Sequence, residues 1–265
     1  MNETTPTSPE AVAAGLPART EAALATADLE LWAIVPTYNE ADGIVEMVSA
    51  LLEALPVGSR VLIVDDNSPD GTGRIADRLA EQHPSVSILH RPEKVGLGPA
   101  YIAGFQYALA RDAGLILQMD ADLSHDPGEV PNLLKRIESA DVVLGSRYVR
   151  GGQIEQWGNR RKQISRWGSR YARAILGIDI SDLTGGFKLF RAEVLRSIDL
   201  ETIRSRGYAF QVEITYRASK RGYEIAEVPI TFYDRRVGKS KMTIAIVLEA
   251  AWRVPAIRLR GSAVG

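Results

Sequence analysis

Asp120 and Asp122 are separated by a single residue and are the strongest candidates for chemistry in this sequence. They follow the apolar run Leu115–Met119, so both carboxylates can face one side of an extended strand end. Two convergent carboxylates suit a hard divalent cation such as Mg²⁺ or Mn²⁺, whose remaining positions are filled by water or phosphate oxygens. Such pairs also occur by chance in exposed turns, but the place after a buried strand favours a cation that neutralises a diphosphate leaving group.

A second acidic pair, Asp65 and Asp66, follows the apolar run Val61–Val64. Its oxygens could accept hydrogen bonds from the N–H groups of a nucleobase. The alternative is capping of the next helix, which Asp70 and Thr72 could equally supply. The sequence has neither a Gly-x-Gly-x-x-Gly motif after the first strand nor a Gly-Lys-Ser/Thr phosphate loop. A nucleoside diphosphate held by a metal is therefore favoured over one held by a glycine-rich loop.

The elements that must position these pairs alternate between short apolar runs and helical repeats. Strands are expected at Leu31–Val35, Val61–Val64, Val86–Leu89, Leu115–Met119 and Val142–Leu144. Helices are expected at Gly43–Leu55, Ile75–Leu79, Gly98–Ala110 and near Val130–Ile137. This alternation predicts an α/β domain with a mostly parallel central sheet. Polar clusters follow four of the strands, and ligands bind beyond the carboxyl ends of such sheets, so we expect one site on that rim.

The composition excludes several kinds of protein and of site. The 265 residues are 45% hydrophobic and 25% charged, which is typical of a globular chain and not of a disordered or fibrous one. With no cysteine, disulfides, thiolate zinc sites and iron–sulfur clusters are excluded, and three scattered histidines do not make a metal site. Residues 1–140 carry 21 acidic and 9 basic side chains, whereas residues 141–265 carry 12 and 23. The basic second half suggests an anionic partner, although two differently solvated faces would give the same balance.

No segment of the sequence is expected to span a membrane. The most apolar stretch, Met242–Ala251, is far shorter than the ~20 residues that a span needs. Residues 1–28 lack the basic-then-apolar order of a signal peptide and have no periodic apolar face, so we expect a disordered tail and a cytoplasmic protein. The predicted domains are then residues 29–241 and a C-terminal amphipathic helix at residues 242–265.

Four motifs between Val35 and Tyr148 resemble glycosyltransferase family 2. They are Val35-Pro36-Thr37-Tyr38-Asn39-Glu40, Val64-Asp65-Asp66-Asn67-Ser68-Pro69-Asp70-Gly71-Thr72, Met119-Asp120-Ala121-Asp122 and Gly145-Ser146-Arg147-Tyr148. Downstream motifs narrow the resemblance to the polyprenol-phosphate (dolichol-phosphate) mannose synthases of this family. They are Asp182-Leu183-Thr184-Gly185-Gly186-Phe187-Lys188, Gly207-Tyr208-Ala209-Phe210-Gln211-Val212-Glu213, Glu227-Val228-Pro229-Ile230 and Arg235-Arg236-Val237-Gly238-Lys239-Ser240-Lys241. The resemblance covers about residues 30–245 and implies a GT-A fold, which is a Rossmann-like single domain.

The resemblance implies transfer of mannose from GDP-mannose to a polyprenyl (dolichyl) monophosphate with inversion at the anomeric carbon. The residues it places around the donor are Pro36, Tyr38 and Glu40 along the nucleotide, Val64 and Asp66 near guanine and ribose, and Asp120, Ala121 and Asp122 at the metal and diphosphate. Many relatives have Gln where this chain has Ser124, which could ligate the metal directly or through water. Gln211, within the motif that begins at Gly207, is expected among the substrate-binding residues.

A lipid phosphate is already ionised near neutral pH, so it can attack without a protein base. It needs cationic side chains that position it against an anionic donor. The candidates are Arg147, Arg161, Arg235 and Lys241, all in the basic half of the chain. Arg147, Arg235 and Lys241 are expected to be catalytic together with Asp122, while each single arginine could instead be a solvated surface charge.

Basic and aromatic side chains alternate in residues 150–175, which suits a membrane interface or a nucleic acid. The lipid substrate favours the membrane, and the acidic first half disfavours nucleic acid. Met242–Leu259 is expected to lie on the membrane surface as well, or to pack on the sheet as an ordinary helix. We therefore expect peripheral binding at the cytoplasmic face of a membrane or to a membrane-embedded partner.

Two other functions remain open from the sequence. The same fold could use UDP-glucose or another UDP-sugar as donor, because the acidic pair after Val64 does not separate guanine from uracil. A catalytically inactive nucleotide-binding regulator is the other alternative. It is disfavoured because a regulator would not need both a metal rim and a phosphate clamp.

Overall fold

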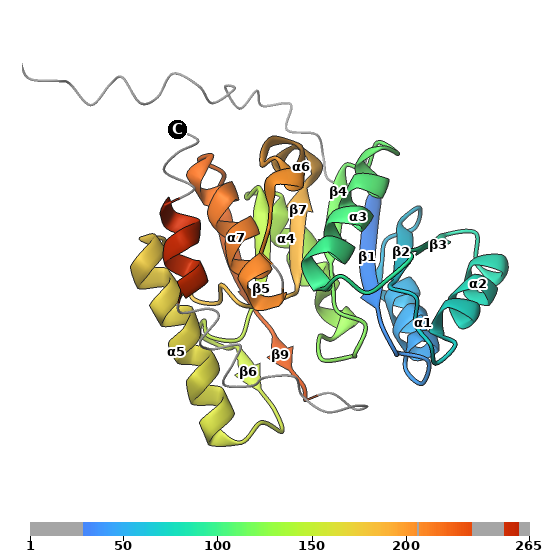
Figure 1. Ribbon diagram of the computed structural model, residues 1–265, viewed down its shortest axis with the longest axis horizontal. Coiled ribbons are helices and arrows are strands. Elements are labelled where there is room, and N and C mark those ends of the chain that lie inside the picture. The colour runs from blue at the N-terminus through green and yellow to red at the C-terminus, as the bar shows by residue number, and fades with distance from the viewer. Residues whose placement is uncertain (1–28, 206, 235–251, 260–265) are drawn as a thin grey trace, which may run out of the picture.

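A seven-stranded sheet runs through the computed structural model, which describes residues 29–205, 207–234 and 252–259 (Figure 1). Its strands are β1 (Leu31–Thr37), β2 (Arg60–Asp65), β3 (Val86–His90), β4 (Leu115–Gln118), β5 (Val142–Ser146), β7 (Lys188–Arg191) and β8 (Ile225–Pro229). They lie in the order β3-β2-β1-β4-β7-β5-β8. Every neighbouring pair is parallel except those of β7, which runs antiparallel to β4 and β5. The tail expected at residues 1–28 lies outside the described residues.

Helices pack on both faces of this sheet (Figure 1). They are α1 (Ile44–Ala54), α2 (Thr72–Gln82), α3 (Leu97–Leu109), α4 (Val130–Ile137), α5 (Asn159–Leu176), α6 (Ala192–Ser197) and α7 (Gly207–Lys220). Because successive residues of a strand point to opposite faces, β1 contributes Trp32 and Ile34 to one hydrophobic core and Leu31, Ala33 and Val35 to the other. The first core includes side chains of α3, α5, α6 and α7, and the second those of α1, α2 and α4. Burial on both faces explains the continuous apolar run of β1.

The α/β fold predicted from the sequence is confirmed, with each expected strand and helix of residues 30–150 in its place. The boundaries differ by a few residues, most clearly at α2, which begins at Thr72 instead of Ile75. Asp70 accepts a hydrogen bond from Thr72 N (3.0 Å), and Gly71 has a left-handed φ of 91° that turns the chain into the helix. The capping interpretation of this turn therefore applies to Asp70.

The antiparallel direction of β7 was not part of the sequence prediction. Apolar alternation marks a strand but carries no information about its direction. After α5 the chain reaches the sheet from the carboxyl edge of the parallel strands and pairs Lys188 with Gln118 of β4 and Leu144 of β5. The amino end of β7 therefore lies where its neighbours end.

A second, parallel sheet of two strands joins β6 (Gln153–Ile154) to β9 (Thr231–Phe232), beside α5 (Figure 1). An isolated antiparallel bridge pairs Phe232 with His125, and Tyr233 N donates a hydrogen bond to Ser124 O (3.0 Å). This small sheet thus connects the loop after β4 to the segments that follow β5 and β8.

Residues 252–259 form a helix that packs beside α5. Val254 and Ile257 are buried in the same core as α5, and Arg258 donates a hydrogen bond to Ile175 O near the end of α5. Trp252 and Leu259 are exposed. The helix expected at residues 242–265 is present over these eight residues, and its other residues lie outside the described chain. Within the described ranges, no helix is long and apolar enough to cross a membrane.

Candidate active site

The carboxyl ends of the parallel strands form one rim, along which the predicted site residues gather. β1 ends at Thr37, β2 at Asp65 and β5 at Ser146, and Asp120 follows shortly after β4. Because β7 is antiparallel, the residues that precede β7, including Gly186, also lie at the rim. Ligands of open α/β sheets bind in this position.

Backbone hydrogen bonds join the loop after β1 to the loop after β2. Asn39 N donates to Ser68 Oγ (3.1 Å), and Glu40 N donates to Thr72 Oγ1 (3.0 Å). Asn39 adopts a left-handed φ of 60°, a conformation that asparagine tolerates better than most residues. The ring of Tyr38 lies 3.5 Å from Lys94 Nζ in a cation–π contact. The loops expected at the nucleotide are thus held together as one surface, with Pro36 and Val64 buried beneath it in β1 and β2.

The acidic pair after Val64 divides into two roles. Asp65 accepts hydrogen bonds from Thr37 Oγ1 (3.1 Å) and Ser68 Oγ (2.6 Å), so it braces the turn. Asp66 forms an ion pair with Arg91 at the end of β3. Burial raises the pKa of Asp66, and Arg91 opposes that rise. Of the two carboxylates, Asp66 is the one whose charge is matched by a basic residue of the rim.

Asp120 is held from two sides. Its Oδ1 accepts a hydrogen bond from the hydroxyl of the buried Tyr101 (2.7 Å). Burial and the Asp120 charge raise the pKa of Tyr101 well above its usual value, so this hydroxyl keeps its proton and donates. On the other side, a Cβ at Gly186 would lie 2.9 Å from Asp120 Oδ2. Only glycine lets the backbone approach the carboxylate this closely.

Asp122 is oriented by its own loop. Its Oδ1 accepts hydrogen bonds from Ser124 N (3.0 Å) and from the Ser124 hydroxyl. Leu123 between them has a left-handed φ of 57°, a strained conformation for a leucine of the kind that clusters at functional sites. Ser124 is buried, and its hydroxyl points to Asp122. In this geometry Ser124 positions Asp122, and its expected role as a metal ligand remains a prediction.

The donor set at Asp120 and Asp122 fits a divalent cation. Both residues are half-buried, lie at the end of one strand and offer hard oxygen ligands. Among the residues that the structure describes, no three His, Cys, Asp or Glu side chains form a group that could hold a metal alone. A cation here would therefore complete its coordination with substrate phosphate and water, which is how Mg²⁺ is commonly bound.

Arg147 forms a buried ion pair with Asp182. Arg147 Nε donates to Asp182 Oδ2 (2.7 Å) and Nη2 donates to Asp182 Oδ1 (2.7 Å), and Nη2 also donates to Thr184 Oγ1 (3.0 Å). Burial alone would raise the pKa of Asp182, but Arg147 holds it below its usual value. Glu227 accepts hydrogen bonds from the backbone N–H groups of Ser181 (2.7 Å) and Asp182 (2.9 Å) and so fixes this loop. Much of the guanidinium is therefore engaged inside the protein, which sequence reasoning did not foresee.

Arg161 lies near Arg147, on the first turns of α5. Its guanidinium stacks 3.7 Å from the ring of Trp157, and its Nη1 donates to Asp234 Oδ1 (2.7 Å). The Arg147 guanidinium is 5.9 Å from the same ring. Arg161 Nε and Trp157 Nε1 are buried without a hydrogen-bond partner in the described structure. The structure thus brings together two of the four predicted phosphate-binding residues, while Arg235 and Lys241 lie outside the described residues.

Gln211 is placed beneath the rim instead of on it. It is 2% exposed, and its Oε1 accepts a hydrogen bond from Gln118 Nε2 (2.6 Å). Gln118 Nε2 also donates to Gly186 O (2.9 Å). The Gln211 side chain is therefore connected to the rim through Gln118 and Gly186, and it is buried beneath the surface that a substrate would meet.

The sequence analysis did not assign roles to Tyr101, Gly186 or Asp182. Gly186 and Asp182 lie in a motif that carries the family resemblance, so a signal was present. Tyr101 carries no such signal, because it looks like one more apolar position of α3 and meets Asp120 only after folding.

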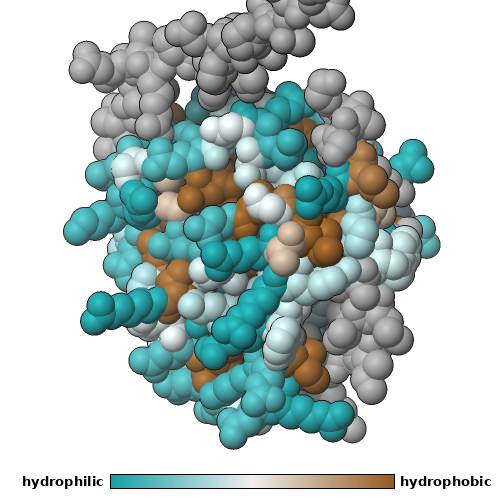
Figure 2. Space-filling model, turned by 90° about the vertical axis from the view of Figure 1, so that its left-hand side faces the viewer, coloured by the Kyte–Doolittle hydropathy of each residue, from teal (hydrophilic) through white to brown (hydrophobic). Residues whose placement is uncertain are grey.

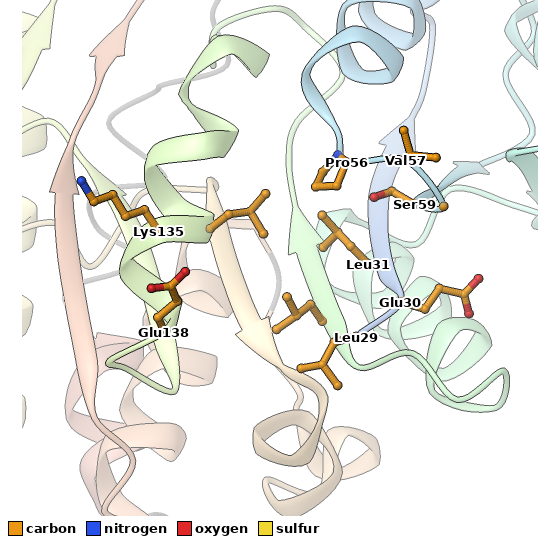
Figure 3. Close-up of a pocket in the computed structure, with 11 residues that line it drawn as sticks. Leu29, Glu30, Leu31, Pro56, Val57, Ser59, Lys135 and Glu138 are labelled. Carbon is orange, nitrogen blue, oxygen red and sulfur yellow. The ribbon is translucent and has the colours of Figure 1, made fainter. Parts of the chain in front are cut away.

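A cavity of about 570 Å³ lies on the side of the sheet away from the rim, near the amino ends of β1, β2 and β4 (Figure 3). Leu29, Leu31 and Pro56 line it, with Lys135 and Glu138 from the end of α4. None of the candidate residues lies there, so the site at the rim is separate from this cavity.

Comparison with known proteins adds a family and close relatives. A family model described as Glycosyl transferase family 2 matches residues 32–199. The chain is 49% identical over 221 residues to an undecaprenyl-phosphate mannosyltransferase of Micrococcus luteus, covering 83% of this chain and 90% of the relative. It is 44% identical over 230 residues to a polyprenol monophosphomannose synthase of Mycolicibacterium smegmatis, covering 86% of each.

Solved structures share the fold at low sequence identity. A glucosyl-3-phosphoglycerate synthase of Mycobacterium tuberculosis in complex with Mn²⁺, UDP-glucose and phosphoglyceric acid superposes with a TM-score of 0.62 at 16% identity, covering 90% of this chain and 81% of that one. A complex of the same enzyme with Mn²⁺, UDP and phosphoglyceric acid gives a TM-score of 0.65 at 17% identity, covering 89% and 80%. At this identity the likeness concerns the arrangement of the elements alone.

Proposed function

Because the chain belongs to glycosyl transferase family 2, we propose that it transfers mannose from GDP-mannose to the phosphate of a polyprenyl (dolichyl) monophosphate. The observation that carries this proposal is the division of one rim into two halves. Asp120 and Asp122 lie on one side, after the end of β4, and the ion-paired Arg147 and Arg161 lie on the other, beyond β5. The names of the two close relatives, which both specify mannose and a polyprenol, support the choice of sugar and acceptor.

On the donor side, the residues would hold GDP-mannose by its nucleoside and by its diphosphate. The surface formed by Tyr38, Glu40 and Asp66 would take the nucleoside, and the carboxylates of Asp120 and Asp122 would hold a Mg²⁺ or Mn²⁺ ion at the diphosphate. When bound, the cation would neutralise charge on the leaving GDP. Tyr101, Gly186 and Ser124 would keep the two carboxylates in position, with Ala121 between them at the nucleotide.

On the acceptor side, basic residues would place the lipid phosphate opposite the donor. An oxygen of the phosphate forms a bond to the anomeric carbon while the bond from that carbon to the GDP oxygen breaks, which inverts the configuration. No protein base is required, because the lipid phosphate has already lost its proton near neutral pH. Arg161, with Arg235 and Lys241 beyond the described ranges, would supply the positive charge, and Arg147 would hold the loop from Asp182 to Thr184 beside it.

A face of the molecule next to this half-site suits a membrane surface. The 18-residue helix α5 carries six basic and no acidic side chains, and it exposes Trp167 (67%) and Tyr171. Trp252 and Leu259 are exposed on the neighbouring helix of residues 252–259. Figure 2 views this side of the molecule and shows apolar patches between hydrophilic side chains. We propose that this face, which we call the α5 face, rests on anionic lipid at the cytoplasmic side of a membrane, alone or beside a membrane-embedded partner.

The experiment that tests the reaction combines purified protein, a short polyprenyl phosphate and radiolabelled GDP-mannose or UDP-glucose, each with and without EDTA. The expected result is label in the lipid from GDP-mannose, lost when EDTA removes the cation. Label from UDP-glucose instead would keep the reaction class and change the donor. No label from either donor would contradict the proposed acceptor.

A further inference from the structure

Lys188, the first residue of β7, is completely buried beneath the rim. Its Nζ donates hydrogen bonds to Gln211 O (2.7 Å) and Thr215 Oγ1 (2.8 Å), both on α7. Thr215 can accept this bond because its own hydroxyl proton goes to Gln211 O (2.9 Å). A buried ammonium that meets only neutral acceptors is costly, so its presence below a catalytic rim needs an explanation.

The hydrogen bonds of Lys188 can be made by a charged ammonium and kept by an uncharged amine. A charged lysine has three N–H donors, whereas Lys188 makes two hydrogen bonds in the described structure. A neutral amine has two N–H groups, which these acceptors satisfy completely. No carboxylate of the described residues lies within ion-pair distance of Lys188, so nothing in direct contact requires the third proton.

The charged groups that act on Lys188 come from the two sides of the rim. Burial lowers the pKa of Lys188 to about 7, although the Asp182 and Asp120 carboxylates oppose this change. Asp182 already has Arg147 as its partner. On α7, the carboxylate of Glu213 pairs with Arg217. Asp120 accepts its hydrogen bond from Tyr101 of α3, which stays neutral, and its carboxylate lies against Gly186, two residues before Lys188. Of the two carboxylates, Asp120 is therefore the one that Lys188 would balance.

We propose that Lys188 is the internal counter-charge of Asp120 and that a divalent cation binding at Asp120 and Asp122 displaces a proton from Lys188 into solvent. The inference rests on the cation site of the proposed function. The divalent ion and the Lys188 ammonium would repel each other beside the same Asp120 carboxylate, and of the two only the lysine can lose its charge. The resulting amine keeps its hydrogen bonds to Gln211 O and Thr215 Oγ1. Lys188 is thus a positioning residue, which acts on the reaction through Asp120.

The proposal predicts that cation binding becomes tighter as pH rises through 7. Below that pH, Lys188 carries its charge and opposes the incoming cation, whereas above it the charge is absent. Lys188→Met removes the charge at every pH, so its cation affinity should depend less on pH. Lys188→Arg keeps the charge at every pH, so it should bind the cation more weakly than wild type at pH 8 and release no proton.

The test is calorimetric titration of Mn²⁺ into the protein with GDP, in two buffers of different ionisation enthalpy at pH 6, 7 and 8. Protons released by the nucleotide cancel when wild type is compared with Lys188→Met. The wild type should release about half a proton more per cation at pH 7, about nine tenths more at pH 6 and about one tenth more at pH 8. Lys220→Met, an exposed lysine on α7, is the matched control and should behave as wild type.

The outcomes separate this inference from the proposed function. If Mn²⁺ does not bind to the wild type at all, the proposed cation site is wrong. If Mn²⁺ binds but the wild type releases no more protons than Lys188→Met, the role of Lys188 is overturned and the cation site stands. Should Lys188→Met fail to fold, the comparison uses Lys188→Arg, and equal proton release by wild type and Lys188→Arg overturns the proposal.

Discussion

Single residues in contact with Asp120 and Asp122 set the positions of these two carboxylates. Tyr101 donates to Asp120, the Ser124 hydroxyl donates to Asp122, and Gly186 leaves room for the Asp120 carboxylate. A shift of a few tenths of an ångström in such groups changes the geometry of a cation and its phosphate ligands. The rim is therefore most sensitive to small substitutions just behind it.

Gly186→Ala tests this sensitivity. The added Cβ would lie 2.9 Å from Asp120 Oδ2 and must displace it, so transfer should fall at least about tenfold, or ~1.4 kcal/mol. The free energy of unfolding should change by no more than ~1 kcal/mol. Gly168→Ala on α5 is the control, because a Cβ there meets nothing within 4 Å. Equal activity of both variants in the radiolabel assay would contradict the close approach.

Asp122→Ala tests the carboxylate itself. Loss of one of two oxygen ligands should abolish Mn²⁺-dependent GDP-mannose binding and transfer while the far-UV circular dichroism stays unchanged. Calorimetry measures the binding, and the radiolabel assay measures transfer. Asp126→Ala changes an exposed aspartate of the same loop, whose carboxylate accepts a hydrogen bond from Gly128 N, and should remain active. Turnover by Asp122→Ala would remove Asp122 from the proposed cation site.

Among the elements, the loop between α5 and β7 depends on one ion pair. Asp182 is fully buried and receives two guanidinium hydrogen bonds from Arg147, while Glu227 of β8 fixes its backbone. This loop also carries Gly186 to Asp120. A single buried pair thus connects the end of β5, the start of β7 and β8.

Asp182→Asn should destabilise the protein by about 3–5 kcal/mol, because it leaves the buried Arg147 charge without a counter-ion. The pKa of Asp182 is lower in the folded than in the unfolded chain. Its contribution to stability is therefore present above the unfolded value of about 4 and is lost as pH falls through the folded value. Urea unfolding at pH 7 and at stepwise lower pH measures both effects.

The surface variant Asp179→Asn is the control for this measurement. Asp179 pairs with Arg173 at the protein surface, where its side chain is 89% exposed, and such pairs contribute little. Equal stability of Asp182→Asn and Asp179→Asn would show that the buried pair is not needed to hold the loop.

At the scale of the whole molecule, the acidic first half and the basic second half of the sequence supply different parts of the structure. The acidic first half supplies β1 to β4 and the proposed donor side of the rim, while the basic second half supplies α5 and the proposed acceptor side. Arg161 near the start of α5 belongs to the proposed acceptor half-site, and Trp167 farther along the same helix is exposed on the α5 face. A lipid held at that face would therefore reach the acceptor half-site along one helix.

Trp167→Ala should lower partitioning onto vesicles that contain anionic lipid by about tenfold, or ~1.4 kcal/mol, because the exposed ring is lost from the interface. Co-sedimentation with the vesicles measures the effect, and added salt should weaken binding of wild type and variant alike. Val57→Ala, at an exposed apolar residue of the turn between α1 and β2, should bind as wild type. Absence of vesicle binding by the wild type would contradict a docking surface that works without a partner.

The sequence was sufficient to predict those features of the structure that depend on residues close together in the chain. Periodicity predicted each strand and α-helix from Leu31 to Ser146, and the strand-end position of Asp120 and Asp122 followed from it. It was not sufficient for contacts between distant segments. The bond from Tyr101 to Asp120, the pairing of Arg147 with Asp182 and the direction of β7 arise only when the chain closes on itself.

The burial of Gln211 and Lys188 was also not predictable from neighbouring residues. Both lie in motifs whose polar residues look like surface groups, and Gln211 was expected to meet a substrate. The structure buries both side chains, because the amino end of β7 and α7 pack against each other directly beneath Gly186. Whether a polar residue faces solvent or the interior depends on this packing and not on its type.

The reversed direction of β7 also determines where the chain can be extended or labelled. Residues 177–187 approach β7 from the rim, so a change in their number would displace Asp182 and Gly186 together. The turn between α1 and β2 lies at the opposite edge, beside the cavity, where Val57 is fully exposed (Figure 3). A fluorophore or affinity tag placed at that turn would leave both the rim and the α5 face open, so immobilised protein could still be presented with vesicles and donor.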